Sequence, residues 1–222
     1  MDQKPELILS GDGSHSIVSS VFNTAYHSRH GAVTESRVVF IAAALDYLLG
    51  KGYKSIDVFE MGFGTGLNAV LAQKWAEEHQ TQINYHTVEA FPVNYEVIWD
   101  LNYGMLLQCE DTLEQLHTCT WDSEHTISTY FTFVKWQNRI EDLDIRQSFD
   151  AVFYDAFAPA TQPELWQVPV LSKVYAWMRQ GSVLTSFCAQ GAFKRTLKEV
   201  GLTVESIPGP PGKREMTRAV KH

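Results

Sequence analysis

The sequence predicts an α/β fold in which a mainly parallel, seven-stranded sheet carries helices on both of its faces. Short runs rich in β-branched and aromatic residues alternate along the chain with longer segments whose apolar residues recur at helical spacing. A glycine-rich turn at residues 62–66 joins the first strand of this alternation to its first helix. Alternation of this kind is typical of a parallel sheet, since parallel neighbours need a crossover that is usually a helix. At 222 residues and 45% apolar content, the chain can bury the core that this fold requires.

An N-terminal extension, residues 1–50, is expected to pack on the main domain. It is predicted to contain, in order, a hairpin at 7–19, a polar and aromatic segment at 26–36 that is unlike a core segment, and an apolar, alanine-rich helix at 38–49. The hairpin prediction rests on Asp12-Gly13 as its turn. Gly50 ends the helix, so we place the main domain at residues 51–222.

The main domain is predicted to begin with the strand at 55–60 and to close with an antiparallel pair of strands. Its strands are expected at 55–60, 83–89, 130–136, 148–154, 182–187, 203–207 and 217–220. Its helices are expected at 67–79, 171–178 and 192–200, with a partly helical segment at 92–118. The chain shows no internal repeat and no low-complexity linker.

The net charge of −8 argues against indiscriminate binding to nucleic acid, because phosphate contacts need clustered Lys and Arg. Residues 190–222, however, carry seven basic and three acidic residues, which favours contact with nucleic acid at one place only. The sequence contains no run of about 18 apolar residues, so no membrane span is expected. The N-terminus lacks the apolar core of a signal peptide. Cys109, Cys119 and Cys188 have no metal-ligand or redox spacing. We therefore expect a cytoplasmic protein that binds no membrane and no metal.

The turn at 62–66 predicts the binding site of a nucleoside-containing cofactor. A phosphate-binding P-loop would need a lysine after its last glycine, where Leu67 stands. A dinucleotide site spaces its glycines by two and then three, whereas Gly62, Gly64 and Gly66 are spaced by two and two.

Two acidic residues narrow the choice of cofactor. Glu60, just before the turn, disfavours a pyrophosphate and suits the cationic methionine end of S-adenosylmethionine. Glu89, at the end of the second strand, can accept hydrogen bonds from both ribose hydroxyls, a role that NAD sites share. The two residues together with the glycine spacing favour S-adenosylmethionine.

A second unusual stretch, residues 153–166, follows the fourth strand of the main domain at the edge where open α/β sheets bind ligands. Asp155 is the candidate catalytic residue, because a carboxylate there can hold an amine and accept its proton. Phe157 and Trp166 offer flat faces on which a nucleobase could stack. The alternative is a polar strand end covered by a hydrophobic loop.

These motifs together resemble the MnmC/MnmD tRNA methyltransferases, over about residues 10–220. The residues that carry the resemblance are Asp12-Gly13-Ser14, Tyr26-His27-Ser28, Gly31-Ala32-Val33-Thr34-Glu35-Ser36, Phe63-Gly64-Thr65-Gly66-Leu67-Asn68, Asp155-Ala156-Phe157-Ala158-Pro159, Gln162-Pro163-Glu164-Leu165-Trp166, Ala189-Gln190-Gly191 and Gly209-Pro210-Pro211-Gly212-Lys213-Arg214-Glu215-Met216. The combination is specific, although no single motif is.

The resemblance implies a Rossmann-like, class I S-adenosylmethionine-dependent methyltransferase. It implies methyl transfer from S-adenosylmethionine to the amine of 5-aminomethyl-2-thiouridine at the wobble position of tRNA. Two-domain members of the family carry an FAD-dependent oxidase domain, and nothing in this chain matches it, so the stand-alone methyltransferase form is expected. Two alternatives remain from the residues alone: a small-molecule amine methyltransferase or polyamine aminopropyltransferase on the same fold, and a non-enzymatic nucleoside-binding or tRNA-binding scaffold.

The resemblance also implies roles for individual residues. It implies that the methyl donor is bound by Glu60, Gly62, Gly64, Thr65, Gly66 and Asn68, and that Glu89 binds its ribose. Asn138 stands where many relatives have the aspartate that contacts adenine, with Glu141 or Asp142 as substitutes. Asp155 matches the aspartate beside the reacting amine. The substrate side is assigned to Tyr26, His27, Ser28 and Phe157, and the tRNA phosphates to Lys194, Arg195, Lys213 and Arg214.

Overall fold

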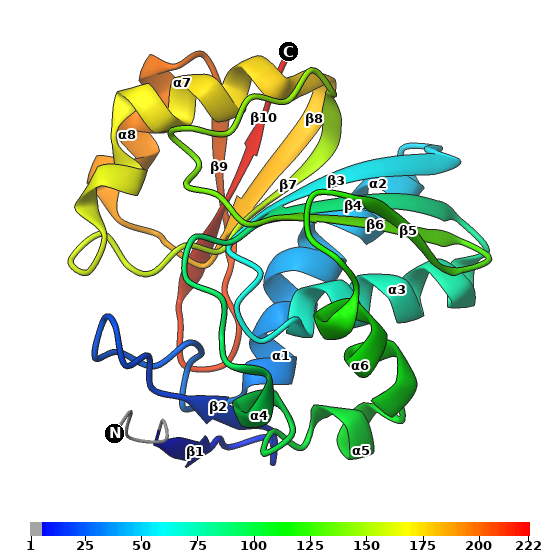
Figure 1. The fold of residues 1–222 in the computed structure, drawn as a ribbon. Helices are drawn as coiled ribbons and strands as arrows, with labels where there is room; N and C mark the ends of the chain where they lie inside the picture. Colours follow the sequence, from blue (N-terminus) through cyan, green and yellow to red (C-terminus); the bar gives the residue numbers. More distant parts are fainter. Residues whose placement is uncertain (1–5) are drawn as a thin grey trace.

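The computed structural model describes residues 6–222, and an eight-stranded sheet forms its centre (Figure 1). The strand order is β5-β6-β4-β3-β7-β8-β10-β9. The parallel strands are β3 (Ser55–Met61), β4 (Gln82–Val88), β6 (Phe131–Trp136), β7 (Phe149–Tyr154) and β8 (Met178–Ser186). The antiparallel strands at the two edges are β5 (Glu124–Ser128), β10 (Glu215–Val220) and β9 (Thr203–Pro208). The predicted mainly parallel α/β sheet is confirmed.

The sheet has eight strands rather than the predicted seven, because the sequence did not reveal β5. This strand pairs with β6 alone, and its register slips between Thr126 and Ser128. None of its residues is buried. An edge strand with no buried face needs no alternation of apolar residues, so it carries no periodic signal in the sequence.

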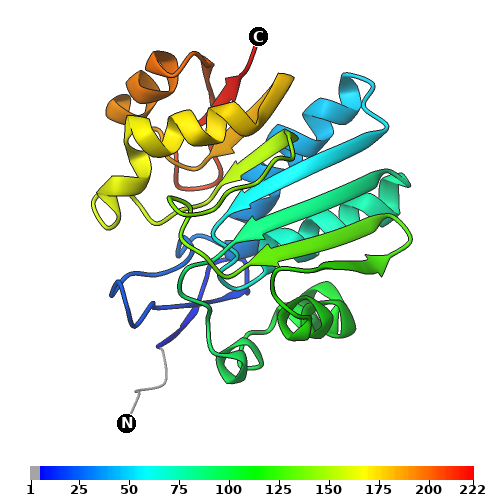
Figure 2. The ribbon, with the colours of Figure 1, turned by 45° about the horizontal axis from the view of Figure 1, so that its top comes forward.

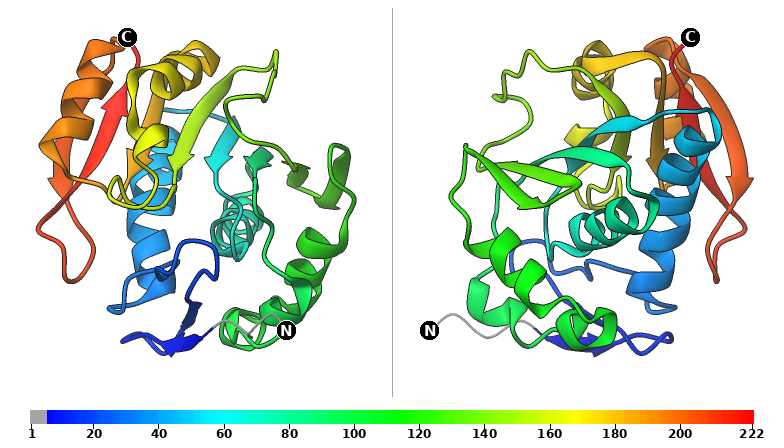
Figure 3. Two further views of the ribbon diagram at one scale, coloured as in Figure 1. Left: turned by 60° about the vertical axis from the view of Figure 1, so that its left-hand side comes forward. Right: turned by 90° about the vertical axis from the view of Figure 1, so that its right-hand side faces the viewer.

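Different helices cover the two faces of the sheet (Figures 2 and 3). The helical segment at residues 32–50, α3 (Leu67–His79) and α6 (Glu110–Thr118) share one buried apolar cluster with one face. On the other face, η2 (Pro163–Trp166), α7 (Val168–Trp177) and α8 (Gly191–Glu199) share a second cluster. The short helices α4 (Tyr95–Ile98) and α5 (Tyr103–Leu107) lie between β4 and α6 in the chain.

The predicted N-terminal hairpin is present as β1 (Leu7–Leu9) paired with β2 (His15–Ile17). It packs beside α5, where the hydroxyl of Tyr103 donates to the carbonyl of His15 at 2.7 Å. The predicted extension starts at residue 1, and its first five residues lie outside the described part of the chain. The domain boundary after residue 50 stays a prediction.

The first long helix begins at Ala32, six residues earlier than predicted. It runs through α1 (Ala32–Ser36), the π-helical η1 (Arg37–Asp46) and α2 (Tyr47–Gly50). The expectation that residues 32–36 are unlike a core segment is therefore wrong, since Ala32, Val33, Glu35 and Ser36 are buried.

The cap of this helix comes from the hairpin turn about twenty residues upstream. The N–H groups of Ala32 and Val33 donate to Ser14 Oγ at 3.1 and 3.3 Å, and that of Thr34 donates to Asp12 Oδ2 at 2.8 Å. These hydrogen bonds satisfy helix donors that have no intrahelical partner. Burial alone would raise the pKa of Asp12, but the hydrogen bonds that its carboxylate accepts from Ser14 and Thr34 outweigh it and lower this pKa. A Cβ at Gly31 would lie 2.5 Å from the Asp12 carboxylate, so the turn requires glycine there.

No helix of the described residues is long and apolar enough to cross a membrane. Within residues 6–222, no group of three or more His, Cys, Asp or Glu side chains could hold a metal ion. Cys109 and Cys188 are buried free thiols, and Cys119 is a half-buried one.

Candidate active site

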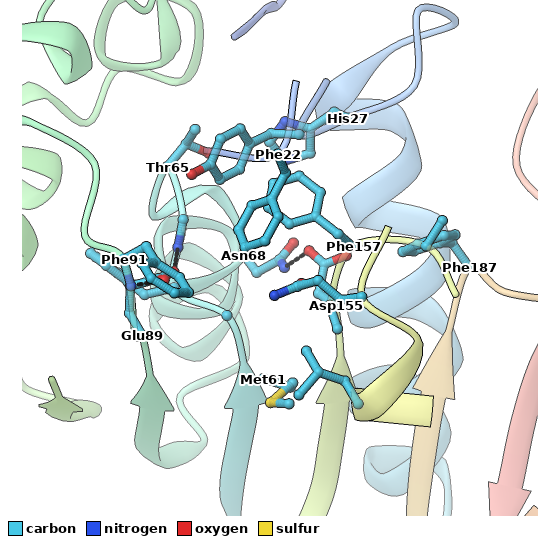
Figure 4. A pocket seen from close by; sticks show the side chains of 18 of the residues that line it. Phe22, His27, Met61, Thr65, Asn68, Glu89, Phe91, Asp155, Phe157 and Phe187 are labelled. Atoms are coloured by element: carbon cyan, nitrogen blue, oxygen red, sulfur yellow. Dashed lines mark hydrogen bonds between the residues drawn. The ribbon is translucent and has the colours of Figure 1, made fainter. Parts of the chain in front are cut away.

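The carboxyl ends of β3, β4 and β7 meet at a cavity of about 460 Å³ (Figure 4). Its walls come from five segments that are far apart in sequence: 22–28 in the N-terminal part, 61–65 after β3, 88–91 after β4, 138–141 after β6 and 155–158 after β7. The remaining wall residues lie outside these segments and include Glu35, Asn68, Phe187 and Lys213. This is the edge at which open parallel sheets bind ligands, and the volume lies in the range of small-molecule sites.

The glycine turn after β3 forms the floor of the cavity. Gly62 and Gly64 have φ angles of +90° and +51°, which residues with a side chain rarely adopt. A Cβ on Gly64 would lie 3.0 Å from the ring of Tyr26, so that ring packs directly on the turn. Thr65 also lines the cavity, whereas Gly66 precedes α3 and lies outside the wall.

Glu89 joins the end of β4 to the glycine turn. Its two carboxylate oxygens accept the N–H groups of Gly64 at 2.9 Å and Phe91 at 2.8 Å (Figure 4). Burial raises the pKa of Glu89, and these backbone donors oppose the rise. Each oxygen keeps a lone pair that can accept a hydroxyl proton from the cavity.

Asp155 stands directly after β7 and faces the same cavity. Asn68 on α3 donates from Nδ2 to Asp155 Oδ2 at 2.8 Å (Figure 4). Burial raises the pKa of Asp155 to about 7, although the Asn68 hydrogen bond lowers it. A carboxyl group with a pKa near neutrality can both accept and release a proton at physiological pH.

Glu35 and Lys213 form an ion pair in the cavity wall that the sequence analysis missed. Lys213 Nζ donates to the Glu35 carboxylate and lies 4.3 Å from the ring centre of Phe187. Glu35 is 8% exposed and also accepts the N–H of Ser28 at 3.0 Å. The structure thus places Lys213 inside the cavity wall, not among the exposed basic residues with which the sequence grouped it.

One feature of the sequence could have revealed Glu35. Ala32, Val39 and Ala43 recur at helical spacing and form the buried side of the first helix. Glu35 falls on that side, three residues after Ala32 and four before Val39. An acidic residue within an apolar helical stripe indicates a buried, partnered charge.

Aromatic rings gather in one part of the cavity wall. Phe157 lies with its ring centre 5.0 Å from both Phe22 and Tyr26, and Phe22 lies 5.5 Å from Phe91. The sequence predicted Tyr26 and Phe157 here and missed Phe22 and Phe91. The expectation that Trp166 offers a stacking face is wrong: it is 4% exposed, and its indole N–H donates to the carbonyl of Phe157 at 2.9 Å. Trp166 therefore anchors the loop that carries Phe157.

His27 and Ser28, which the resemblance assigned to the substrate side, line the cavity. Burial lowers the pKa of His27 to about 4, and the carboxylates of Glu35 and Asp12 oppose the fall. Its imidazole is therefore neutral at physiological pH, and its Nδ1 lies 3.4 Å from Ser16 Oγ. The catalytic or structural role of His27 stays a prediction.

Asn138 and Glu141 lie in the wall formed after β6, whereas Asp142 does not. The Asn138 side-chain oxygen accepts the N–H of the next residue, Arg139, at 2.8 Å. Glu60 is fully buried and does not line the cavity. The cofactor roles of Asn138 and Glu60 stay predictions.

The other three basic residues that were assigned to tRNA phosphates, Lys194, Arg195 and Arg214, lie outside the cavity. Lys194 forms an ion pair with Glu215 at 3.0 Å and a hydrogen bond with Ser206 at 2.8 Å. Arg195 and Arg214 are exposed. Their contact with tRNA phosphates stays a prediction.

The site can accommodate a nucleoside-containing methyl donor. Positive φ angles let the turn backbone approach a ligand closely, Glu89 offers carboxylate lone pairs at the end of the neighbouring strand, and the volume suffices. Together, the parallel sheet and this cavity define a protein of the S-adenosylmethionine-dependent methyltransferase class. The sequence model of a family described as "S-adenosyl-L-methionine-dependent methyltransferase" matches residues 102–222, and the chain belongs to that family.

Relatives extend the likeness over nearly the whole chain. The chain is 30% identical over 94% of its length to the "tRNA 5-methylaminomethyl-2-thiouridine biosynthesis bifunctional protein MnmC" of Acinetobacter baylyi, and 29% identical over 96% of its length to the protein of that name from Cupriavidus necator. It covers 36% and 34% of those proteins, so it spans about a third of the length of the relatives. The crystal structure of MNMC2 from Aquifex aeolicus shares the fold, with a TM-score of 0.74 at 23% identity over 97% of this chain and 70% of that one.

Proposed function

We propose that this protein transfers a methyl group from S-adenosylmethionine to the amine of 5-aminomethyl-2-thiouridine at the wobble position of tRNA. The observation that carries the proposal is Asp155, a half-buried carboxyl with a pKa raised to about 7, which faces the cavity beside the glycine turn. The name of the Acinetobacter baylyi and Cupriavidus necator relatives, which refers to 5-methylaminomethyl-2-thiouridine in tRNA, supports the nature of the acceptor. Since the chain matches a third of their length, the other activity implied by the word "bifunctional" is not transferred to it.

Bound S-adenosylmethionine would supply an electrophilic methyl group on its sulfonium. The turn at 62–65 and Asn68 would hold the methionine end of this donor, and Glu89 would accept hydrogen bonds from the ribose hydroxyls. Asn138 and Glu141 would lie on the adenine side.

Asp155 would act on the amine of the acceptor. An aminomethyl group arrives as an ammonium, which has no lone pair for attack. The ionised carboxylate of Asp155 can accept one proton from it and leave a neutral amine. Because Asn68 holds Oδ2, the other oxygen, Oδ1, is left to orient the amine.

Glu35 and Lys213 would tune this proton transfer. The negative charge of Glu35 raises the pKa of Asp155, and the positive charge of Lys213 lowers it. Phe22 and Phe157 offer ring faces for the pyrimidine of the target nucleotide. The exposed Arg195 and Arg214 would contact phosphates, and the predicted cytoplasmic location would give the protein access to tRNA.

The test is methyl transfer with purified protein, labelled S-adenosylmethionine and tRNA that carries 5-aminomethyl-2-thiouridine. The proposal expects the label in 5-methylaminomethyl-2-thiouridine after nucleoside mass analysis, and none in the same tRNA with an unmodified wobble uridine. Asp155→Ala should abolish transfer, whereas Asp142→Ala, an exposed acid outside the cavity, should not. Label that enters a polyamine instead of tRNA would decide against the proposal and for a small-molecule enzyme.

A further inference from the structure

Glu60 is an acidic side chain buried beneath the active site. It has no exposed surface, and alternation along β3 puts it on the same face as Ile56 and Val58, which pack in the cluster that contains α3. In the sheet it stands beside Thr87 on β4 and Phe153 on β7. It does not line the cavity, so its carboxyl group does not meet the space in which a ligand would bind.

Several polar atoms around Glu60 have no hydrogen-bond partner. They are both carboxyl oxygens of Glu60, the side-chain oxygen of Asn68, and the hydroxyls of Tyr85 and Thr87. Burial raises the pKa of Glu60, and the side chains of Thr87, Asn68 and Tyr85 lie close enough to its carboxyl to oppose this rise as hydrogen-bonding groups. Among residues 6–222, no lysine, arginine or histidine forms a salt bridge with Glu60.

This environment favours the neutral form of Glu60. An ionised carboxylate that is buried without a cation costs several kcal/mol, and such a group takes up a proton instead. Burial accordingly raises the pKa of Glu60 to about 8. At neutral pH, Glu60 therefore carries an O–H that can be donated within the cluster.

The protonation of Glu60 determines what Asn68 can do. The amide nitrogen of Asn68 donates a hydrogen bond to Asp155, whereas its amide oxygen accepts none. A neutral Glu60 adds a donor to the cluster and leaves the Asn68 nitrogen on Asp155. An ionised Glu60 could donate nothing to the Asn68 oxygen and would favour the flipped amide, in which the nitrogen turns away from Asp155 and toward Glu60.

We propose that Glu60 is a buried neutral acid that positions the amide of Asn68, and through it Asp155, instead of binding the cationic end of the methyl donor. Its effect on catalysis rests on the proposed function, since it acts through Asp155. Its effect on donor binding does not rest on the proposed function. A Glu60 that positions Asn68 and a Glu60 that binds the cationic end of the donor predict opposite results when donor binding is measured.

The titratable groups that face Glu60 are few. Tyr85 on β4 has a pKa raised well above its usual value by burial and by the Glu60 charge. Asp155, after β7, raises the pKa of Glu60 by its charge. Asn68, which faces Glu60 from α3, carries no charge. Above about pH 8, Glu60 is therefore the group whose ionisation disturbs the Asn68–Asp155 hydrogen bond.

The experiment compares Glu60→Gln with Glu78→Gln, a change of an exposed glutamate on α3. Glutamine keeps the shape of a neutral carboxyl and a donor. We expect Glu60→Gln to bind S-adenosylmethionine within about twofold of wild type and to transfer methyl within about threefold at pH 7. The wild type should lose activity above about pH 8, and Glu60→Gln should not. Weakening of donor binding by about tenfold or more in Glu60→Gln would overturn the proposal.

A second measurement does not depend on turnover or on the fold of a variant. An infrared spectrum of the wild type in which glutamate is isotopically labelled should show the carbonyl band of a protonated carboxyl at pH 7, which is lost as pH rises through about 8. A spectrum without that band at pH 7 would refute the neutral acid. If the wild type fails to methylate tRNA, the proposed function fails, while donor affinity and this band still test Glu60.

Discussion

Replacing Asp155 with asparagine should make the protein more stable at neutral pH while it abolishes methyl transfer. Burial raises the folded-state pKa of Asp155 from 3.8 to about 7. The unfolded chain thus releases this proton near pH 4, whereas the folded protein holds it up to about pH 7. The folded state binds more protons across this window, so wild-type stability falls as pH rises through it. Asparagine has no proton to release and escapes this loss.

The size of the effect follows from the pKa shift. A shift of about three pH units corresponds to about 4 kcal/mol above pH 7. Because Asp155 is partly exposed in the cavity, water screens its charge, and we halve the figure to about 2 kcal/mol. For a chain of this length, that stabilisation raises Tm by about 4–8 °C. Asparagine also keeps an oxygen that can accept the hydrogen bond from Asn68 Nδ2.

Urea unfolding of wild type and Asp155→Asn measures the difference between their free energies of unfolding. We expect this difference to be near zero at about pH 4 and fully present at about pH 8, because the gain appears only when Asp155 is ionised in the unfolded chain. Asp142→Asn, a change of an exposed acid, should show no such pH dependence. The reasoning is refuted if Asp155→Asn is less stable than wild type at pH 8, or if the difference is the same at both pH values. Methyl transfer by Asp155→Asn should fall by at least about a hundredfold.

Three further changes test other parts of the structure. Asp12→Ala should lower the free energy of unfolding by about 1–3 kcal/mol, because the donor of Thr34 loses its acceptor; urea unfolding measures it. Glu35→Gln should shift the acidic limb of the rate–pH profile to lower pH, since the Glu35 charge raises the pKa of Asp155, and Lys213→Gln should shift it to higher pH. Glu89→Gln should weaken S-adenosylmethionine binding by about tenfold in calorimetry, because an amide replaces one of the two acceptor oxygens.

Each of these predictions has an outcome that contradicts it. A loss below about 0.5 kcal/mol in Asp12→Ala, equal to that of the exposed Asp144→Ala, would mean that the cap contributes little. Shifts of the same sign in Glu35→Gln and Lys213→Gln would show that their charges do not act on Asp155. Donor affinity unchanged in Glu89→Gln would place the ribose elsewhere.

The centre of the fold follows from local sequence. The strand β3, the glycine turn and α3 lie where the pattern predicted them, because each is encoded by neighbouring residues. Glu89 and Asp155 stand at strand ends that the same pattern located, and both face the cavity.

What the sequence did not reveal depends on contacts between distant residues. The first helix begins at Ala32 and is capped by Asp12 and Ser14, which lie about twenty residues earlier. The capping side chains are therefore not found next to the start of the helix in the sequence. The pairing of Glu35 with Lys213 joins residues 178 positions apart. Such contacts exist only after folding, and periodicity cannot reveal them.

The helix cap has a consequence for how the cavity is assembled. Gly11 N–H donates to the carbonyl of Arg29 at 2.9 Å, and the N–H groups of residues 32–34 donate to Asp12 and Ser14. These hydrogen bonds close the chain between residues 11 and 34 into a loop. That loop carries Phe22 and Tyr26 into the cavity wall, where the Tyr26 ring packs on the glycine turn at Gly64. The cavity wall is thus built from two parts of the backbone that separate hydrogen bonds hold in place, the sheet and this loop. Exchanging this loop for that of a relative would therefore alter both the wall at Phe22 and, through Tyr26, the surroundings of the glycine turn.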